Sequence, residues 1–163
     1  VQLAEKFSVR KRGGFIELEY LNELPSIPKA VLPFSYSIYL PCGGRVVAEQ
    51  MMLNTRILDL INGKQVNPQN EAFISLKTLP DFLFIRSRKE GDMFRPLGSP
   101  GSKKLSDWMI DRQWSKAKKT STPIFLNQKD EIIWIPGFAP AESAKVSKAD
   151  LRVIRLTYQQ SDT

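Results

Sequence analysis

Short stretches of alternating apolar and polar residues, separated by turns that carry glycine or proline, recur along this 163-residue chain. Residues 7–12 and 15–20 are separated by Gly13-Gly14, a spacing that is typical of a β-hairpin. Because successive side chains of a strand point to opposite faces, this alternation favours antiparallel sheets with one buried face. Further strands are predicted at residues 34–40, 45–48, 72–76, 82–86, 124–126, 131–135 and 151–158.

Three segments between these stretches have a less regular pattern. Residues 24–33 contain three prolines and are predicted to form an irregular connection. Residues 50–61 fit a strand and a short helix equally well. Residues 62–70 have the composition of an interior linker, which would divide a β-rich leading part (1–70) from a second domain (71–163). One continuous domain is the alternative.

One segment has the spacing of an amphipathic helix. Residues 102–113 carry an apolar stripe at helical intervals, and Ser102 can serve as the N-cap. Lys103 stands four residues before Asp107, where the two side chains can pair on the helix surface. The sequence therefore predicts an α+β fold of mostly antiparallel hairpins, with one clear helix after a glycine-rich basic loop.

The composition restricts the chemistry that this chain can perform. It contains no histidine, which removes the commonest general base and the commonest metal ligand, so we expect no metal site. Its single cysteine, Cys42, lies in a predicted turn at 41–44, cannot form an internal disulfide, and has no imidazole to activate it. A chain with one free cysteine suits the reducing cytoplasm. No apolar stretch is long enough to span a membrane.

The positive charge is concentrated in residues 86–119. Ten lysines and arginines stand there against four carboxylates, which accounts for six of the seven net charges of the chain. A local excess of positive charge, with an isoelectric point near 9.6, favours a polyanionic partner such as nucleic acid or an anionic membrane surface. A solvated basic surface without a partner is the plain alternative.

The 98–102 loop leads directly into the predicted helix. Backbone N–H groups at a helix start can bind a phosphate oxygen, whereas Lys103 and Lys104 in the first turn would oppose the helix dipole unless an anion joined them. The loop differs from the Gly-x-x-Gly loop of KH domains and from a Walker A loop in its context. The candidate phosphate-binding residues are Arg86, Arg88, Lys89, Arg95, Gly98, Gly101, Ser102, Lys103, Lys104, Arg112, Lys116, Lys118 and Lys119.

The remaining polar and aromatic side chains of this segment favour structural roles. Asp92 is expected to order the turn at Gly91 or to pair with Arg95. No pair of carboxylates here has a second catalytic group beside it, so we expect no catalytic residue in the chain. Trp114 favours a core position, with stacking on a base or sugar as the alternative.

Several uncommon residue combinations follow one another in the second half of the chain. Residues 85–98 read Ile-Arg-Ser-Arg-Lys-Glu-Gly-Asp-Met-Phe-Arg-Pro-Leu-Gly, and residues 101–107 read Gly-Ser-Lys-Lys-Leu-Ser-Asp. They are followed by Ile110-Asp111, Thr122-Pro123-Ile124, residues 130–137 and Lys145-Val146. In this order and approximate spacing, the chain resembles the C-terminal domain of the tRNA(Ile)-lysidine synthetase family.

The resemblance implies a part of a larger protein, in agreement with a chain that begins at Val1. Enzymes of that family use ATP to adenylate a cytidine in the anticodon of isoleucine tRNA and then join lysine to it. Their chemistry belongs to an N-terminal domain with a Ser-Gly-Gly-x-Asp-Ser loop, a motif that this sequence lacks. The resemblance thus implies that ATP binds outside this chain, which itself needs no cofactor and is not catalytic.

The implied partners are tRNA, held at the acceptor stem of isoleucine tRNA, and the enzyme's own catalytic domain, without DNA or membrane. The implied fold is a β-rich α+β domain related to one in phenylalanyl-tRNA synthetase. After Gly137 the chain departs from the family pattern, with Phe138 and Ala139 in place of polar residues, which leaves Lys145 as the expected RNA contact of that loop. A docking domain without RNA contact is the alternative function.

Overall fold

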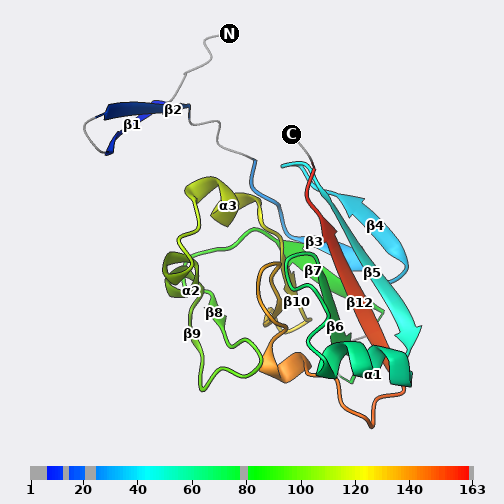
Figure 1. The fold of residues 1–163 in the computed structure, drawn as a ribbon. Helices are drawn as coiled ribbons and strands as arrows, with labels where there is room; N and C mark the ends of the chain where they lie inside the picture. Colours follow the sequence, from blue (N-terminus) through cyan, green and yellow to red (C-terminus); the bar gives the residue numbers. More distant parts are fainter. Residues whose placement is uncertain (1–6, 13–14, 21–24, 78–80, 162–163) are drawn as a thin grey trace.

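Two four-stranded antiparallel sheets form the body of the computed structural model, which describes residues 7–12, 15–20, 25–77 and 81–161 (Figure 1). The strands are β1 (Phe7–Arg12), β2 (Phe15–Tyr20), β3 (Ala30–Pro33), β4 (Tyr36–Tyr39), β5 (Arg45–Met52), β6 (Glu71–Ser75), β7 (Phe82–Arg86), β8 (Met93–Phe94), β9 (Lys103–Lys104), β10 (Ile124–Leu126), β11 (Ile132–Trp134) and β12 (Arg152–Gln159). The helices are α1 (Thr55–Asn62), α2 (Leu105–Asp111), α3 (Lys116–Ser121) and the 3-10 turn η1 (Glu142–Ala144). The predicted α+β class with antiparallel sheets is confirmed.

The first sheet has the strand order β11-β10-β7-β3. Its edge strand β3 lies in the segment predicted to be an irregular connection, and that prediction was wrong. A proline lacks the backbone N–H that a central strand needs, but an edge strand leaves one side unpaired. Pro33 therefore ends β3, opposite Phe82 of β7, without breaking the sheet.

The second sheet has the strand order β4-β5-β12-β6. Its strand β5 continues to Met52, and α1 begins three residues later, so the ambiguous segment 50–61 contains both kinds of structure. The side chain of Asn54 accepts a hydrogen bond from the backbone N–H of Ile57 at 2.9 Å, which caps α1 and sets this boundary.

Both sheets combine strands from either side of residues 62–70. In the second sheet β12 pairs with β5 on one edge and with β6 on the other, and in the first sheet β3 pairs with β7. The 62–70 segment is itself held in place, because the backbone N–H of Gly137 donates to the carbonyl of Pro68 at 2.7 Å.

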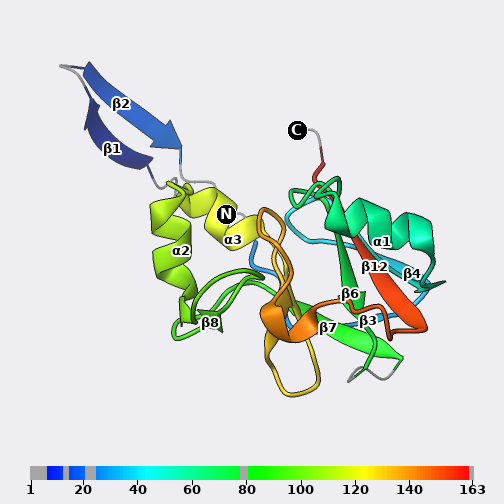
Figure 2. The same cartoon turned by 60° about the horizontal axis from the view of Figure 1, so that its bottom comes forward.

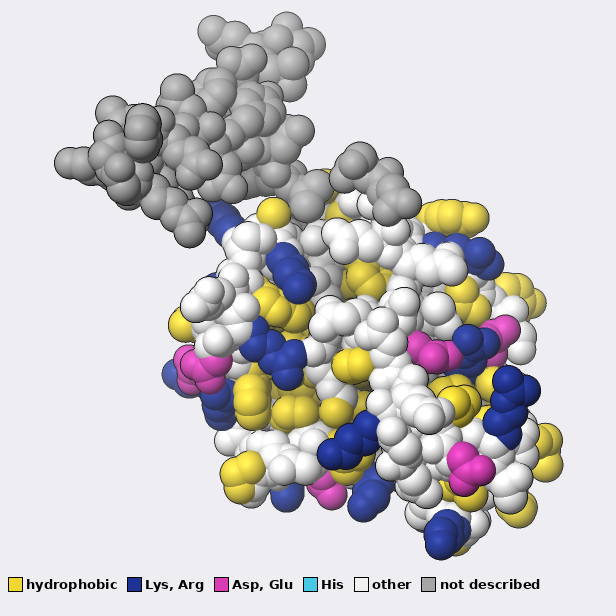
Figure 3. Space-filling view, viewed as in Figure 1, with side chains coloured by type: hydrophobic (Ala, Val, Ile, Leu, Met, Phe, Trp, Pro, Cys, Tyr) yellow, Lys and Arg dark blue, Asp and Glu magenta, His cyan; other side chains and the backbone are white. Residues whose placement is uncertain are grey.

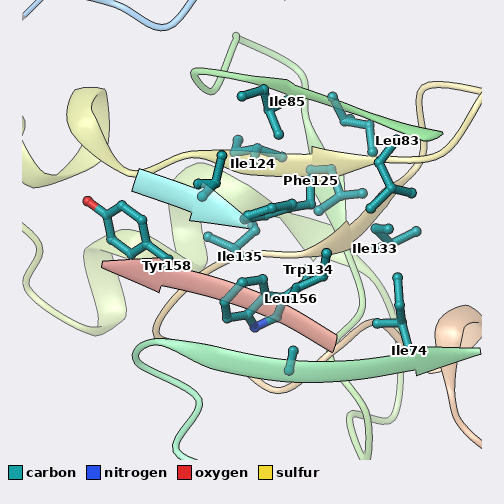
Figure 4. Packing of buried hydrophobic residues seen from close by; sticks show 14 of the residues in the cluster. Ile74, Leu83, Ile85, Ile124, Phe125, Ile133, Trp134, Ile135, Leu156 and Tyr158 are labelled. Carbon is teal, nitrogen blue, oxygen red and sulfur yellow. The ribbon is translucent and has the colours of Figure 1, made fainter. Parts of the chain in front are cut away.

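The main core is made of aliphatic and aromatic side chains from both sheets (Figure 4). Trp134 is fully buried, its ring centroid lies 4.9 Å from that of Phe125, and its indole N–H donates to the carbonyl of Phe138 at 3.0 Å. Leu156 of β12 and Ile74 of β6 face the same core in Figure 4. A smaller cluster around Ile57 joins α1 to the second sheet.

Two features of the helices differ from the sequence predictions. The helix predicted from residue 102 begins at Leu105, because Lys103 and Lys104 are extended and form β9 opposite β8. The sequence did not predict α3, whose N-cap Ser115 accepts a hydrogen bond from the backbone N–H of Lys118 at 3.1 Å. The β1–β2 hairpin is confirmed, while its Gly13-Gly14 turn lies outside the described residues. Among the described helices, none has the length and apolar character needed to cross a membrane.

Candidate nucleic-acid interface

The helix start predicted beside the 98–102 loop is not formed there, and that helix boundary was wrong. Lys104 is extended, with ψ at 134°, and β9 pairs with β8 through Met93↔Lys104 and Phe94↔Lys103. Phe94 is buried, so it anchors this two-stranded ladder in the core. The backbone N–H of Gly98, expected to face an anion at the helix, instead donates to Glu142 Oε2 at 3.1 Å.

The loop between β8 and β9 packs against the segment that follows Gly137. The backbone of Leu97 donates to the carbonyl of Pro140 at 2.8 Å, and Glu142 N donates to the carbonyl of Arg95 at 3.0 Å. Arg95 is exposed, and its Nε donates to the carbonyl of Ser99 at 3.2 Å. Lys145, also exposed, follows η1 in this neighbouring segment.

Arg86, the last residue of β7, is buried and forms an ion pair through both terminal nitrogens of its guanidinium. Its Nη1 and Nη2 donate to the two carboxylate oxygens of Asp92, both at 2.9 Å, and Asp130 lies 3.7 Å away. Hydrogen bonding to Asp92 raises the pKa of Arg86, in opposition to its burial. Asp92 thus pairs with Arg86 rather than with Arg95, and as predicted it orders the turn, accepting from the backbone N–H of Lys89 at 2.8 Å.

Asp130, in the turn between β10 and β11, forms ion pairs with two further cations. It accepts from Lys29 Nζ at 3.0 Å and from Lys89 Nζ at 3.1 Å. These hydrogen bonds, together with the charge of Arg86, hold the pKa of Asp130 below its ordinary value of 3.8. We call Lys29, Arg86, Lys89, Asp92 and Asp130 the paired network.

A second group of cations lies over aromatic rings. Lys103 Nζ is 4.1 Å from the centroid of Trp108 and contacts Asp111, not Asp107 as predicted. The Arg112 guanidinium lies 3.8 Å from the ring of Phe138, and its Nη1 donates to the carbonyl of Gly137. Such contacts fix the cation and keep its apolar stem out of water.

Trp114 belongs to this aromatic cluster. Its side chain is buried, 5.4 Å from Phe138 between ring centroids, so the predicted core position is confirmed over the stacking alternative. Lys118 Nζ lies 4.5 Å from the Trp114 centroid. Gly137 approaches so closely that a Cβ atom there would lie 2.9 Å from the indole.

The remaining cations of the basic segment lie at the surface. Arg88, Lys104, Lys116 and Lys118 are exposed, and Lys119 is half-buried. None of them has a carboxylate within ion-pairing distance among the residues that the structure describes. Figure 3 shows lysine and arginine side chains, interspersed with hydrophobic surface, along the side of the molecule formed by α3 and α2.

Two hollows meet at the Gly91 turn, and sequence analysis predicted neither. A groove of about 610 Å³ runs between the 91–102 loop, the β10–β11 turn and η1; its lining includes the carboxylates of Asp92, Asp130, Glu131 and Glu142. A smaller cavity of about 220 Å³ is lined by Arg88, Lys89, Glu90, Gly91, Asp92, Lys104 and Ser106. The short strands β8 and β9 create it, and two-residue strands carry no detectable alternation in the sequence.

Cys42 lies in the β4–β5 turn, as predicted. Its Sγ donates to the carbonyl of Ser121 at 3.4 Å, and burial raises the pKa of the thiol. A raised pKa keeps the thiol protonated and poorly nucleophilic. No group of three metal-binding side chains occurs within residues 25–77 and 81–161.

A match to a known protein family falls on the stretch that holds both hollows. Residues 83–156 match the family model of the TilS substrate C-terminal domain. These residues form a TilS C-terminal domain. A crystal structure described as the TilS C-terminal domain shares the fold, with a TM-score of 0.68, 22% identity, and coverage of 83% of this chain and 100% of that one.

Curated relatives of this TilS C-terminal domain are tRNA(Ile)-lysidine synthases. The Dehalococcoides mccartyi protein is 32% identical over 116 residues, which cover 71% of this chain and 23% of that protein. The Oceanobacillus iheyensis protein is 28% identical over 156 residues, 94% of this chain and 32% of the relative. The chain therefore spans a quarter to a third of these relatives' length.

The predicted relation to phenylalanyl-tRNA synthetase is confirmed at the level of the fold. An N-terminal fragment of the Pyrococcus horikoshii phenylalanyl-tRNA synthetase β-subunit matches with a TM-score of 0.51 and 11% identity. The match covers 94% of this chain and 58% of that fragment.

Proposed function

We propose that this chain is the tRNA-binding C-terminal region of a tRNA(Ile)-lysidine synthase. One observation carries the proposal: the exposed cations Arg88, Lys104, Lys116 and Lys118 have no carboxylate partner among the described residues, and all lie within the family-matched stretch. Cations left unneutralised at a surface raise the local potential, and RNA binds such surfaces through its phosphates.

The proposal refines the set of contact residues. Arg86 belongs to the interior of the paired network, where it shapes the Gly91 turn rather than touching RNA. Gly98 uses its N–H on Glu142, so its part in RNA contact is to turn the loop, with φ at +82°. The proposed contacts are Arg88, Lys89, Arg95, Gly101, Ser102, Lys103, Lys104, Arg112, Lys116, Lys118, Lys119 and Lys145.

The roles of the rest of the proposed enzyme are inferred from its tRNA(Ile)-lysidine synthase relatives. In the proposed whole protein, a separate catalytic domain binds ATP and joins lysine to the anticodon cytidine of isoleucine tRNA. This chain holds the acceptor stem of the same tRNA and contacts the catalytic domain. An A-form stem presents its phosphates to a surface of this kind with little need for base reading.

The experiment that tests the proposal is tRNA binding by this chain as a function of salt. Replacement of Lys116 and Lys118 by glutamate should raise the Kd for an isoleucine tRNA transcript by about ten-fold or more. The logarithm of the binding constant of the unaltered chain should fall with log[salt] at a slope of about −0.7 to −0.9 for each phosphate contacted.

The matched control changes the same charge on the opposite side of the molecule. Arg56 in α1 and Lys64, just after the end of α1, are exposed. Helix α1 lies away from α2 and α3 in both Figure 1 and Figure 2. Glutamate at these two positions should change the Kd less than three-fold, because exposed charges more than a Debye length (about 10 Å) apart are largely screened. Equal losses from both pairs, or a salt-independent Kd, would favour the docking alternative.

A further inference from the structure

The smaller of the two hollows brings together two parts of the basic segment, residues 88–92 and 104–106. The β8–β9 ladder sets Met93 opposite Lys104, and the backbone N–H of Leu105 donates to the carbonyl of Asp92 at 2.8 Å. As a result Arg88 and Lys104, from separate segments, line the same cavity of about 220 Å³. Its lining also contains the hydroxyl-bearing residue Ser106.

Some of the charged side chains that line this cavity already form ion pairs, and others do not. Lys89 is held by Asp130 at 3.1 Å, and Asp92 is held by Arg86 at 2.9 Å. Arg88 and Lys104 are exposed and, within the described part of the chain, pair with no carboxylate; Glu90 also lines the cavity and is exposed.

The lining therefore holds three cations and two carboxylates, a net formal charge of one. That charge matches a phosphodiester, which carries one negative charge, better than a free phosphate dianion. A planar guanidinium binds two phosphate oxygens at once, and an ammonium adds a point charge without a fixed direction.

We propose that Arg88 and Lys104 together hold a single phosphodiester of the RNA backbone in this cavity. The inference rests on the proposed function and deepens it, because it assigns two cations to one phosphate. The Arg88 guanidinium would bind two phosphate oxygens at once, and Lys104 would add a second positive charge. The Ser106 hydroxyl would donate a further hydrogen bond. Gly91, with φ at +86° and open space where a Cβ would lie, leaves room for the phosphate to approach the turn.

The paired network explains why the cavity is formed before RNA arrives. Asp92 is locked by Arg86 and by the backbone N–H of Lys89, so the turn that separates Arg88 from Lys104 is rigid. A site that is already ordered loses less conformational entropy on binding. Lys118 stands apart over Trp114, on α3, and would meet a different phosphate.

Two cations that share one phosphate must be energetically coupled, and a double-mutant cycle measures this. The Kd for an isoleucine tRNA transcript is determined at several salt concentrations for the chain with R88A, K104A and both changes. We expect each single variant to weaken binding about ten-fold and the double variant to weaken it little further. The salt slope should fall by about 0.7 to 0.9, the loss of one phosphate, in all three.

The pair R88A and K118A is the matched control, since it removes the same charge from two separate phosphates. Its effects should multiply to about a hundred-fold, with twice the loss of slope. The variant R88K tests the two-oxygen contact of the guanidinium, because it retains the charge and should still lose most of the affinity. Melting temperatures of the Arg88 and Lys104 variants should stay unchanged, because both side chains are exposed.

Multiplicative losses in the Arg88–Lys104 double variant would overturn the shared phosphate, as would single variants without effect. If the Lys116–Lys118 glutamate variant weakens binding in the same assay, the proposed function survives such a failure. If inorganic phosphate alone, at sub-millimolar concentration, shifts the amide resonances of Gly91 and Ser106, the cavity is a free-phosphate site and the RNA assignment fails.

Discussion

Arg86 and Arg88 stand two residues apart at the end of β7 and differ in almost every physical respect. The Arg86 side chain is 8% exposed and donates two hydrogen bonds to Asp92. Arg88 is exposed, and among the described residues it has no carboxylate partner. Positive charge along this segment therefore has two roles: some cations stabilise the fold, and others stay available to an anion.

The physical reason lies in where the carboxylates are. A buried charge is tolerated only when a partner neutralises it, so every cation that enters the interior must bring an acid with it. Asp92 and Asp130 perform that task for Arg86, and Asp130 also pairs with the exposed Lys29 and Lys89. Cations outside their reach keep their hydration and their field.

The largest expected effect comes from breaking the buried pair. R86A should lower the free energy of unfolding of this chain by about 3 to 5 kcal/mol, because it leaves the buried Asp92 carboxylate without its main partner. Urea unfolding followed by tryptophan fluorescence measures this loss. R88A, two residues further on, should stay within about 0.5 kcal/mol of the unaltered chain. Similar losses from both variants would remove the distinction between the two arginines.

A smaller contrast is expected between the neighbours Lys103 and Lys104. K103A should cost up to about 1 kcal/mol of stability, because Lys103 pairs with Asp111 and lies over Trp108 with a side chain that is 36% exposed. K104A should leave stability unchanged and weaken tRNA binding instead. The paired measurements are a melting curve and a Kd for each variant. A reversed pattern, with K104A the less stable protein, would contradict the assignment of the two lysines.

The smallest effect concerns acid stability. The pKa of Asp130 is held below its ordinary value by Lys29 and Lys89, so its ionised form is favoured in the folded state. This contribution to stability is therefore present above about pH 4 and is lost as the pH falls through the lower, folded-state pKa. Because Asp130 is partly exposed, the gain is expected to be under about 1 kcal/mol.

The measurement is urea unfolding at pH 7 and at several values below pH 4, for the chain and for D130N. The variant should be less stable at pH 7, and the difference should shrink toward the lowest pH. A constant difference across the range would show that Asp130 acts through something other than its charge.

Local pattern predicted several strands well and failed where pairing across a loop decides the structure. The strand at 82–86 agrees with β7 residue for residue, because an apolar run bounded by turns has few other solutions. The start of α2 was predicted three residues early, since Ser102 is a good N-cap in isolation but the β8–β9 pairing draws Lys103 and Lys104 into an extended form. Pairing across a loop outweighs a capping preference of about 1 kcal/mol.

The order of residues alone was enough to predict the antiparallel α+β class, the family-like order of motifs in the second half, and the concentration of positive charge in one segment. Which of those charges remain free was decided only by the tertiary structure. Asp130 neutralises Lys89 from 41 positions away and Lys29 from 101 positions away. Ion pairing depends on distance in space, and the chain order of such partners contains no signal that reveals it.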